Sequence, residues 1–197
     1  MIELLSRYPG ARGRCVRAGR EELPTVKTEH HCQRPRPSRR RTQHCLADAN
    51  GEVDFEIASD NPGDHRVRVG AARDGIFGEL GRHATRVAAR RLDSLIEDGT
   101  VAVDAGTLAH MNVQGHEGQI LAGASRLLAA GGPIAMEFWP YGLRRADGVE
   151  RILGLLPSFD RILNLEHRGA LLDTRDVRGL IERLDADGGH VDLLLVP

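Results

Sequence analysis

Polar side chains able to bind a ligand or move a proton follow an apolar segment near the middle of this 197-residue sequence. Asn112, Gln114, His116 and Glu117 come directly after "LAHM", and Glu137 interrupts the next apolar segment, "IAMEFW". A carboxylate or a histidine beside a bound substrate can accept a proton from it. These residue types at this spacing therefore favour a ligand site with acid–base character.

Three of these residues also have a structural interpretation. Glu117 would fall in the first turn of a helix, where the helix dipole stabilises a carboxylate. His116, next to a glycine, is more typical of an exposed loop. Glu137 would lose its hydration inside an apolar strand unless partners satisfy it, or it would lie at an exposed strand tip. Both interpretations stay open here, and His65, further upstream, is a fourth candidate for proton transfer.

The flanking patterns predict the elements that would position these side chains. "LAHMNV" and "PIAMEFW" are short apolar runs typical of buried strands in a parallel sheet. Between them, apolar residues from Ile120 to Leu128 share one face of a predicted helix, which ends at Gly131. Ligands in doubly wound α/β folds bind beyond the carboxyl ends of the strands. The helix therefore returns the chain to a second strand whose end lies at the same edge.

This placement predicts that polar residues from the two strand ends meet. We expect a single rim of the sheet to carry Asn112, Gln114, Glu117 and Glu137. Gly115 gives the backbone the freedom for a tight turn at that point.

Strand and helix patterns also alternate through the rest of the chain. "GEVDFEIAS" alternates apolar and acidic residues like a half-buried strand, and an Asn-Pro-Gly-Asp turn leads to a second short strand. "ATRVAARRLDSLIEDG" predicts a strand followed by a short helix that ends at Gly99. Helices over residues 147–156 and 176–184 separate "PIAMEFW", "FDRILNLEH" and "HVDLLLVP". The expected fold class is an α/β sandwich around a largely parallel sheet.

The first 45 residues differ from the rest in charge and pattern. They carry 11 Lys and Arg against 4 Asp and Glu, whereas residues 46–197 carry 16 against 24. "RPRPSRRR" has no apolar periodicity, so we expect residues 1–45 to be disordered or divergent and an ordered domain to span residues 46–197. No aromatic residue is interleaved for stacking on bases, so a nucleic-acid partner is not expected.

Composition places the protein in the cytoplasm, without a membrane span. No run of about 18 apolar residues is present, and the start of the sequence lacks a leader pattern. Cys15, Cys32 and Cys45 do not form a C-x-x-C pair, so no disulfide framework is expected. His30 and His31 beside Cys32 lack the two to four intervening residues typical of zinc ligands, and no metal site is predicted.

The central residues carry a resemblance to a known family. "RLDSLIEDG" followed by "HMNVQGHEGQILAGASRLLAAGGPIAMEFWP" resembles the second half of the FkbM-type methyltransferases, and "NPGDHRV" resembles a Gly-Asp-His-Arg segment of one branch. The resemblance covers residues 45–197. It implies a Rossmann-like fold that transfers a methyl group from S-adenosylmethionine, usually to a hydroxyl oxygen of a sugar or secondary metabolite.

The resemblance also assigns roles by position. It implies cofactor contacts for Asp93, Asn112, Gln114 and Gly115, while His65, His116, Glu117 and Glu137 are the candidates to assist deprotonation. Asn112 stands where the family usually has an aspartate. The family's first strand, its D-x-G-A-N-x-G-type loop and its acidic second strand have no counterpart here, since "YPGARG" (residues 8–13) follows no apolar strand.

Three hypotheses follow. The first is a methyltransferase that acts on a hydroxyl-bearing small molecule. The second is a truncated or frame-altered family member that keeps the substrate rim, lacks the first strands and binds S-adenosylmethionine weakly or not at all. The third is a binding module that uses its basic amino-terminal segment.

Overall fold

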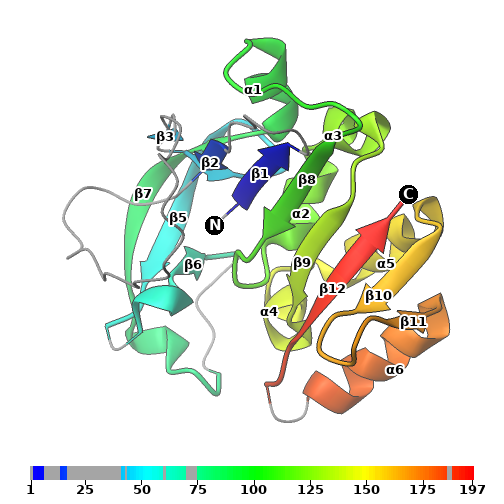
Figure 1. Cartoon of the computed structure of the whole chain (residues 1–197). Helices are drawn as coiled ribbons and strands as arrows, with labels where there is room; N and C mark the ends of the chain where they lie inside the picture. The colour runs from blue at the N-terminus through cyan, green and yellow to red at the C-terminus, as the bar shows by residue number, and fades with distance from the viewer. Residues whose placement is uncertain are drawn as a thin grey trace, which may run out of the picture.

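The computed structural model describes residues 2–6, 14–16, 41–42, 44–59, 61–69, 75–185 and 188–197. Within these residues the strands form an eight-stranded sheet and a four-stranded sheet, and helices alternate with strands along the chain (Figure 1). The predicted α/β class is therefore confirmed at the level of a mixed α/β fold.

The larger sheet has the strand order β11-β10-β12-β9-β8-β1-β2-β3. Its strands are β1 (Ile2–Ser6), β2 (Arg14–Val16), β3 (Arg41–Thr42), β8 (Thr107–Met111), β9 (Ile134–Phe138), β10 (Arg161–Asn164), β11 (Ala170–Leu172) and β12 (Val191–Val196). β8 and β9 are parallel, as are β2 and β3. Every other neighbouring pair in this sheet is antiparallel.

The expectation of a largely parallel sheet is therefore wrong. β12 lies between β9 and β10 and is antiparallel to both. The connection from β10 to β11 is too short for a parallel return, which needs a crossover of about a dozen residues, so these two strands form a hairpin. Apolar runs such as "LLLV" indicate burial but not direction, and direction was the feature that the sequence pattern left open.

Part of the amino-terminal segment belongs to this sheet. β1 pairs with β8 from Ile2 opposite Met111 to Ser6 opposite Thr107, and β2 and β3 extend the sheet beyond it. These three strands fall within residues 1–45, the segment expected to be disordered or divergent. The remainder of residues 1–43, which includes "YPGARG" and all but the last residue of the arginine-rich run, lies outside the described residues.

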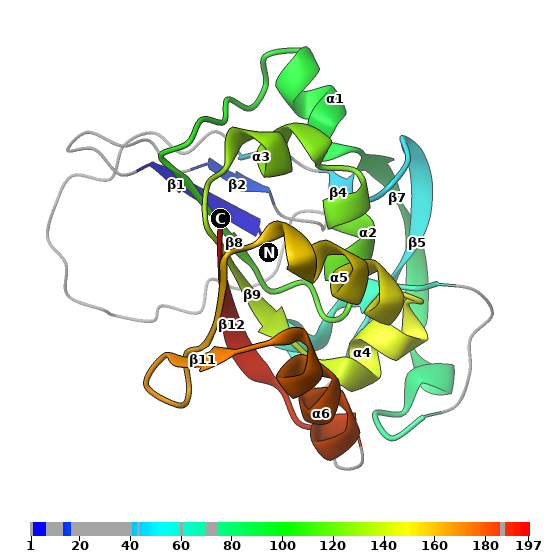
Figure 2. The ribbon, with the colours of Figure 1, turned by 90° about the vertical axis from the view of Figure 1, so that its right-hand side faces the viewer.

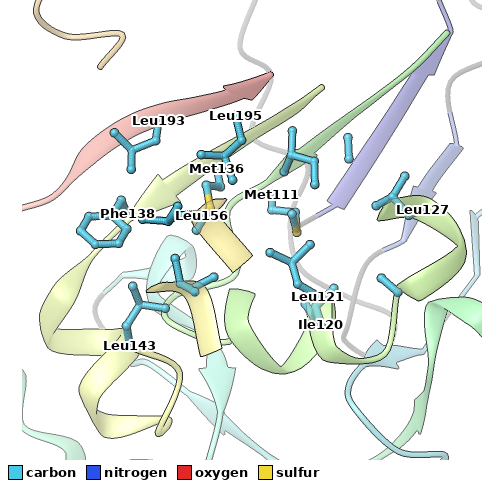
Figure 3. Close-up of a cluster of buried hydrophobic side chains, with 14 of the residues drawn as sticks. Met111, Ile120, Leu121, Leu127, Met136, Phe138, Leu143, Leu156, Leu193 and Leu195 are labelled. Atoms are coloured by element: carbon cyan, nitrogen blue, oxygen red, sulfur yellow. The ribbon is translucent and has the colours of Figure 1, made fainter. Parts of the chain in front are cut away.

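Helices cover one face of the larger sheet. α2 (Glu117–Ala122), α3 (Ser125–Ala130), α4 (Pro140–Arg145), α5 (Val149–Leu155) and α6 (Thr174–Asp185) all lie on the side that faces the viewer in Figure 2. Alternate residues of β8, β9 and β12 point toward them, as Met111, Met136 and Leu193 do in Figure 3. No helix in the described part of the chain is long and apolar enough to cross a membrane.

The helix predicted across residues 120–128 is broken in two. α2 ends at Ala122 and α3 begins at Ser125. Gly123, in the break, lies against the backbone of Ala47, where an added Cβ would come within 2.3 Å of the carbonyl oxygen. The backbone at residue 47 therefore packs against the break between α2 and α3, although the apolar pattern predicts one continuous helix.

The smaller sheet has the order β4-β7-β5-β6. Its elements are β4 (Cys45–Leu46), β5 (Gly51–Ile57), β6 (Arg66–Val67) and β7 (His83–Arg90), with short 3-10 helices η1 (Pro62–Asp64) and η2 (Glu79–Gly81) and the helix α1 (Leu92–Glu97) after β7. β5 and β6 pair antiparallel, as the predicted hairpin requires. The predicted outer face of β5 is wrong at one position, because Glu56 is buried.

Candidate functional site

The predicted clustering of polar side chains at the ends of β8 and β9 is confirmed for three residues. The Nδ2 atom of Asn112 donates to Oε1 of Glu137 at 3.1 Å, and Nε2 of Gln114 donates to Oε2 of Glu137 at 3.1 Å. Nε2 of Gln114 also donates to Oδ1 of Asn112 at 2.8 Å. We call Asn112, Gln114 and Glu137 the rim. Two parallel strands thus bring a carboxylate and two amides from separate parts of the sequence together.

The turn after β8 fixes this arrangement. Gln114 and Gly115 both have positive φ angles, of 57° and 93°. A Cβ on residue 115 would lie 2.3 Å from the backbone carbon of Gly142, in α4. Glycine is therefore required at 115 for the close approach of two backbones, which supports the prediction of a tight turn there.

The environment of Glu137 favours its protonated form relative to a carboxyl in water. Burial raises the pKa of Glu137, and Asp192 acts in the same direction, while His190 and the amide of Asn112 lower it. Nε2 of His190 lies 4.0 Å from Oε1 of Glu137, and the His190 side chain is 56% exposed. Glu137 is thus a carboxyl beside a histidine that reaches solvent.

His190 is a rim neighbour that the sequence analysis missed. It precedes β12, whose residue Asp192 pairs with Glu137. Because β12 is antiparallel to β9, the beginning of β12 lies at the edge where β9 ends. The expected parallel direction would have placed residue 190 at the opposite edge, so only the strand direction could have revealed it.

Glu117 lies beneath the rim instead of on it. Its side chain is fully buried, and its Oε1 atom accepts a hydrogen bond of 3.0 Å from the backbone nitrogen of Val113. Its Oε2 atom has no hydrogen-bond partner among the described residues. Burial raises the pKa of Glu117 to about 7. The carboxyl supports the turn that carries Asn112 and Gln114, and it has no exposed surface for a ligand.

His116 is buried, contrary to the interpretation as an exposed loop residue. Burial lowers the pKa of His116 to about 4, with smaller opposed effects of Asp48 and Arg151, which form an ion pair of 2.9 Å. Neither ring nitrogen forms a hydrogen bond within the described part of the chain. The imidazole is therefore neutral at pH 7 and forms no hydrogen bond with the rim.

Asp93 caps a helix. It accepts hydrogen bonds from the backbone nitrogens of Ser125 and Arg126, at 3.1 and 2.9 Å, and from the Ser125 hydroxyl at 2.6 Å. Burial acts to raise the pKa of Asp93, but these hydrogen bonds and Arg91 outweigh it and hold the pKa below its usual range. The contacts define a structural cap at the start of α3. The cofactor role assigned to Asp93 stays a prediction without a contact to the rim.

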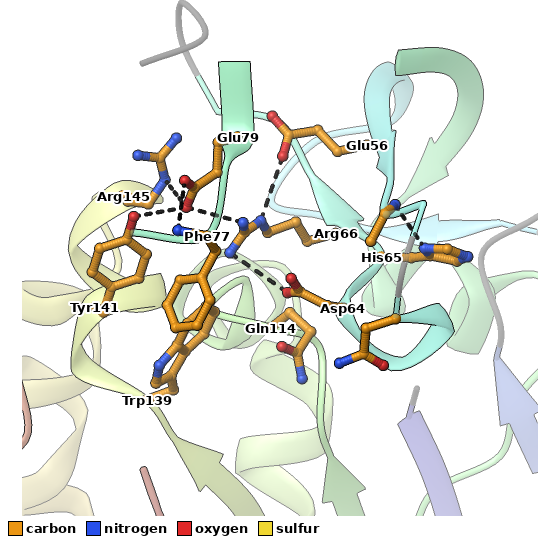
Figure 4. A network of polar contacts seen from close by, with 12 residues as sticks. Glu56, Asp64, His65, Arg66, Phe77, Glu79, Gln114, Trp139, Tyr141 and Arg145 are labelled. Atoms are coloured by element: carbon orange, nitrogen blue, oxygen red, sulfur yellow. Dashed lines mark hydrogen bonds and ion pairs between the residues drawn. The ribbon is translucent and has the colours of Figure 1, made fainter. Parts of the chain in front are cut away.

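His65 supports the small sheet. Its Nδ1 atom accepts a hydrogen bond of 3.0 Å from the backbone nitrogen of Ala58, and its ring packs edge-on against Phe55. In Figure 4 the imidazole points away from Gln114. The structure therefore does not bring His65 to the rim.

A buried ionic network lies next to the rim and was not predicted (Figure 4). Arg66 is only 5% exposed and contacts Glu79 at 3.0 Å and Glu56 at 3.4 Å. The Tyr141 hydroxyl donates to Glu79 at 2.7 Å, and Arg145 approaches the same carboxylate at 3.5 Å. Burial acts to raise the pKa of Glu79, but the hydrogen bond from Tyr141 and the two arginines outweigh it and lower the pKa.

Aromatic rings close one side of this network. The guanidinium carbon of Arg66 lies 5.5 Å from the centre of the Trp139 ring, a distance typical of a cation–π interaction. Phe77 packs edge-on against Trp139 and Tyr141, with ring centres 5.4 and 5.1 Å apart. Positive charge is therefore held in place by carboxylates and aromatic faces between the small sheet and α4.

Comparison with known proteins does not add an identity to this geometry. No family model matches the chain, and no curated protein and no solved structure matches it.

The strand beside β8 differs in direction from the strand that carries the nucleoside-binding turn in Rossmann-like folds. Rossmann-like folds bind such a group with a glycine-rich turn after a strand that runs parallel beside β8. Here β1 occupies that position but is antiparallel, so its first residue, Ile2, lies by the rim and its last, Ser6, lies at the opposite edge. The last residue of β1 therefore lies at the edge opposite Asn112 and Glu137.

Proposed function

We propose that this chain is an FkbM-type methyltransferase domain whose rim binds a hydroxyl-bearing small molecule. The observation that supports this proposal is the position of Glu137, which lies at the carboxyl ends of two parallel strands. Both of its carboxylate oxygens accept hydrogen bonds from side-chain amides. A carboxylate with a raised pKa is matched to accepting a hydrogen bond or a proton from a hydroxyl group. The fixed amides would hold it in one orientation.

In the methyltransferase version of this proposal, the domain transfers a methyl group from S-adenosylmethionine to the bound hydroxyl of a sugar or secondary metabolite. Glu137 would accept the hydroxyl proton, and His190 would connect that carboxyl to solvent. Since catalysis of this kind depends mainly on positioning, the rim would supply the orientation of the acceptor.

A second candidate is a family member that binds the hydroxyl compound without methyl transfer. The direction of β1 favours it, because the strand beside β8 brings its amino end to the rim. This candidate retains the acceptor half of the site and predicts weak or absent binding of S-adenosylmethionine.

Calorimetric titration of the full chain with S-adenosylmethionine separates the two candidates. Micromolar binding, together with transfer of labelled methyl from the cofactor to a panel of neutral sugars and hydroxy acids, would support the methyltransferase. Glu137→Gln should then remove transfer and leave cofactor binding intact. Absence of cofactor binding, with sugar binding that Asn112→Ala weakens, would support the second candidate. If no hydroxyl compound binds at the rim, both are overturned.

A further inference from the structure

A small cavity adjoins the rim on the side of the ionic network. Its volume is about 20 Å³, and the polar side chains that line it are Glu56, Arg66, Arg68, Gln114 and Arg145. Three of these five polar residues are arginines. The residues that line the cavity therefore carry more positive than negative charge. Figure 4 shows two of them, Arg66 and Gln114.

Hydrogen bonds orient the side chains of Arg66, on β6, and Arg68, which follows β6. Glu56 accepts hydrogen bonds from the Nε atoms of Arg66 and Arg68, at 3.4 and 2.8 Å. The Nη2 atom of Arg66 donates to Glu79, while its buried Nη1 atom makes no hydrogen bond within the described residues and lies 3.7 Å from Oδ1 of Asp64. The Nη1 atom of Arg66 is enclosed and faces Asp64, so the arginine available to an anion is Arg68, which is 21% exposed and uses only part of its five N–H donors on Glu56 and the carbonyl of Arg82.

The volume restricts the kind of anion. A cavity needs roughly 10–15 Å³ to hold one water molecule, so the observed space admits a group of one or two such atoms and not a sugar ring. The two oxygens of a planar carboxylate match this space and the planar guanidinium groups better than the four oxygens of a tetrahedral phosphate.

Gln114 connects the cavity to the rim. It lines the cavity, and its Nε2 atom donates to Glu137 and Asn112. We propose that the cavity binds the carboxylate of a hydroxy acid, such as a sugar acid, whose hydroxyl group contacts Glu137. The hydroxyl contact rests on the proposed function, whereas the carboxylate site rests on the arginines alone.

Acetate is the probe for the carboxylate site by itself. Nitrogen–proton spectra of the full chain would be recorded while acetate replaces chloride at constant ionic strength. We expect saturable shifts of the Arg66 and Arg68 Nε–H signals and of the Gln114 side-chain amide. Phosphate should bind more weakly. Shifts that do not saturate overturn the site, and phosphate binding as strong as acetate binding overturns the assignment to a carboxylate.

A matched pair of variants tests whether Arg68 takes part in acetate binding. Arg68→Gln should weaken acetate binding about tenfold or more, because a charge-assisted hydrogen bond is lost. Arg86→Gln is the control, since Arg86 is 71% exposed on β7 and pairs with Glu52. Equal weakening by both variants would indicate a general charge effect and overturn the proposal. If Arg68→Gln does not fold, the acetate titration of the unaltered chain still decides.

A second titration compares glucuronate with glucose. Glucuronate should bind about tenfold tighter or more, and Arg68→Gln should abolish the difference. Equal affinities, both lowered by Asn112→Ala, would overturn the carboxylate site and leave the proposed function standing. Acetate binding without binding of either sugar would overturn the proposed function and the hydroxy-acid ligand and leave the carboxylate site.

Discussion

The buried carboxyl of Glu117 makes the stability of this protein depend on pH in a direction that can be derived. Burial raises the pKa of Glu117 from 4.5 to about 7, so the folded chain holds a proton that the unfolded chain releases as the pH rises above 4.5. By linkage, the contribution of this group to stability is full below the unfolded pKa, falls between pH 4.5 and about 7, and stays low above that range.

The magnitude follows from the change in pKa. A tenfold change in proton affinity is worth about 1.4 kcal/mol, so a change from 4.5 to about 7 lowers the free energy of unfolding by about 3 kcal/mol above neutral pH. Glu117→Gln keeps this side chain neutral at every pH. The glutamine oxygen can accept the hydrogen bond that Val113 donates to Oε1 of Glu117. The variant should therefore avoid the loss.

Urea unfolding at a series of pH values measures this effect. The stability difference between Glu117→Gln and the unaltered chain should increase by about 3 kcal/mol from about pH 4 to about pH 8. Other groups that titrate in this range are common to both proteins and cancel in the difference. Glu182→Gln, which removes a charge from an exposed side chain on α6, is the control. A difference that stays constant over the whole range would refute the reasoning.

Three further substitutions test the packing that positions the rim. Gly115→Ala should lower the free energy of unfolding by about 2–5 kcal/mol, because residue 115 has a positive φ angle and contacts the α4 backbone. Gly131→Ala, at a φ of 71° with nothing within 4 Å, should lower it by only about 1–2 kcal/mol in the same urea assay. Equal losses would exclude the contact. Asp93→Ala should lose about 1–3 kcal/mol by uncapping α3, and unchanged stability would contradict the capping role. Leu143→Ala, fully buried on α4, should lose about 2–5 kcal/mol and exposed Leu171→Ala less than about 1, by thermal unfolding, and similar losses would contradict the assigned core.

The rim could be predicted from the sequence because two local signals agree there. The apolar runs "LAHMNV" and "PIAMEFW" overlap β8 and β9, and the helical pattern between them was long enough for a crossover. A crossover of that length makes neighbouring strands parallel, so their polar ends meet. Asn112 and Glu137 were therefore placed together without knowledge of any other part of the fold.

The remainder of the site depends on contacts that are distant in sequence. The direction of β12 placed His190 beside Glu137, but the apolar pattern of "HVDLLLVP" does not indicate the direction of the strand in the sheet. The alternation of β5 predicted an exposed Glu56, but arginines two elements away bury it in ion pairs. The resemblance assigned Asp93 a cofactor contact, whereas its observed partner is the start of α3, which follows the break in the predicted helix at Gly123.

Strand direction also determines what chemistry this edge of the sheet can support. β8 and β9 end at the edge, and β12 begins there, so a carboxyl, two amides and a histidine converge on it. β1 also begins there, and its last residue, Ser6, lies at the opposite edge. On the side of α4, Gln114 extends the polar surface toward the arginines of the small sheet. The described residues thus offer contacts for the hydroxyl and for the carboxylate of a ligand near β9 and α4. On the side of β1, no strand of the described residues ends in an acidic residue. A hydroxy acid uses the contacts that are present, whereas a nucleoside would need contacts from the side of β1.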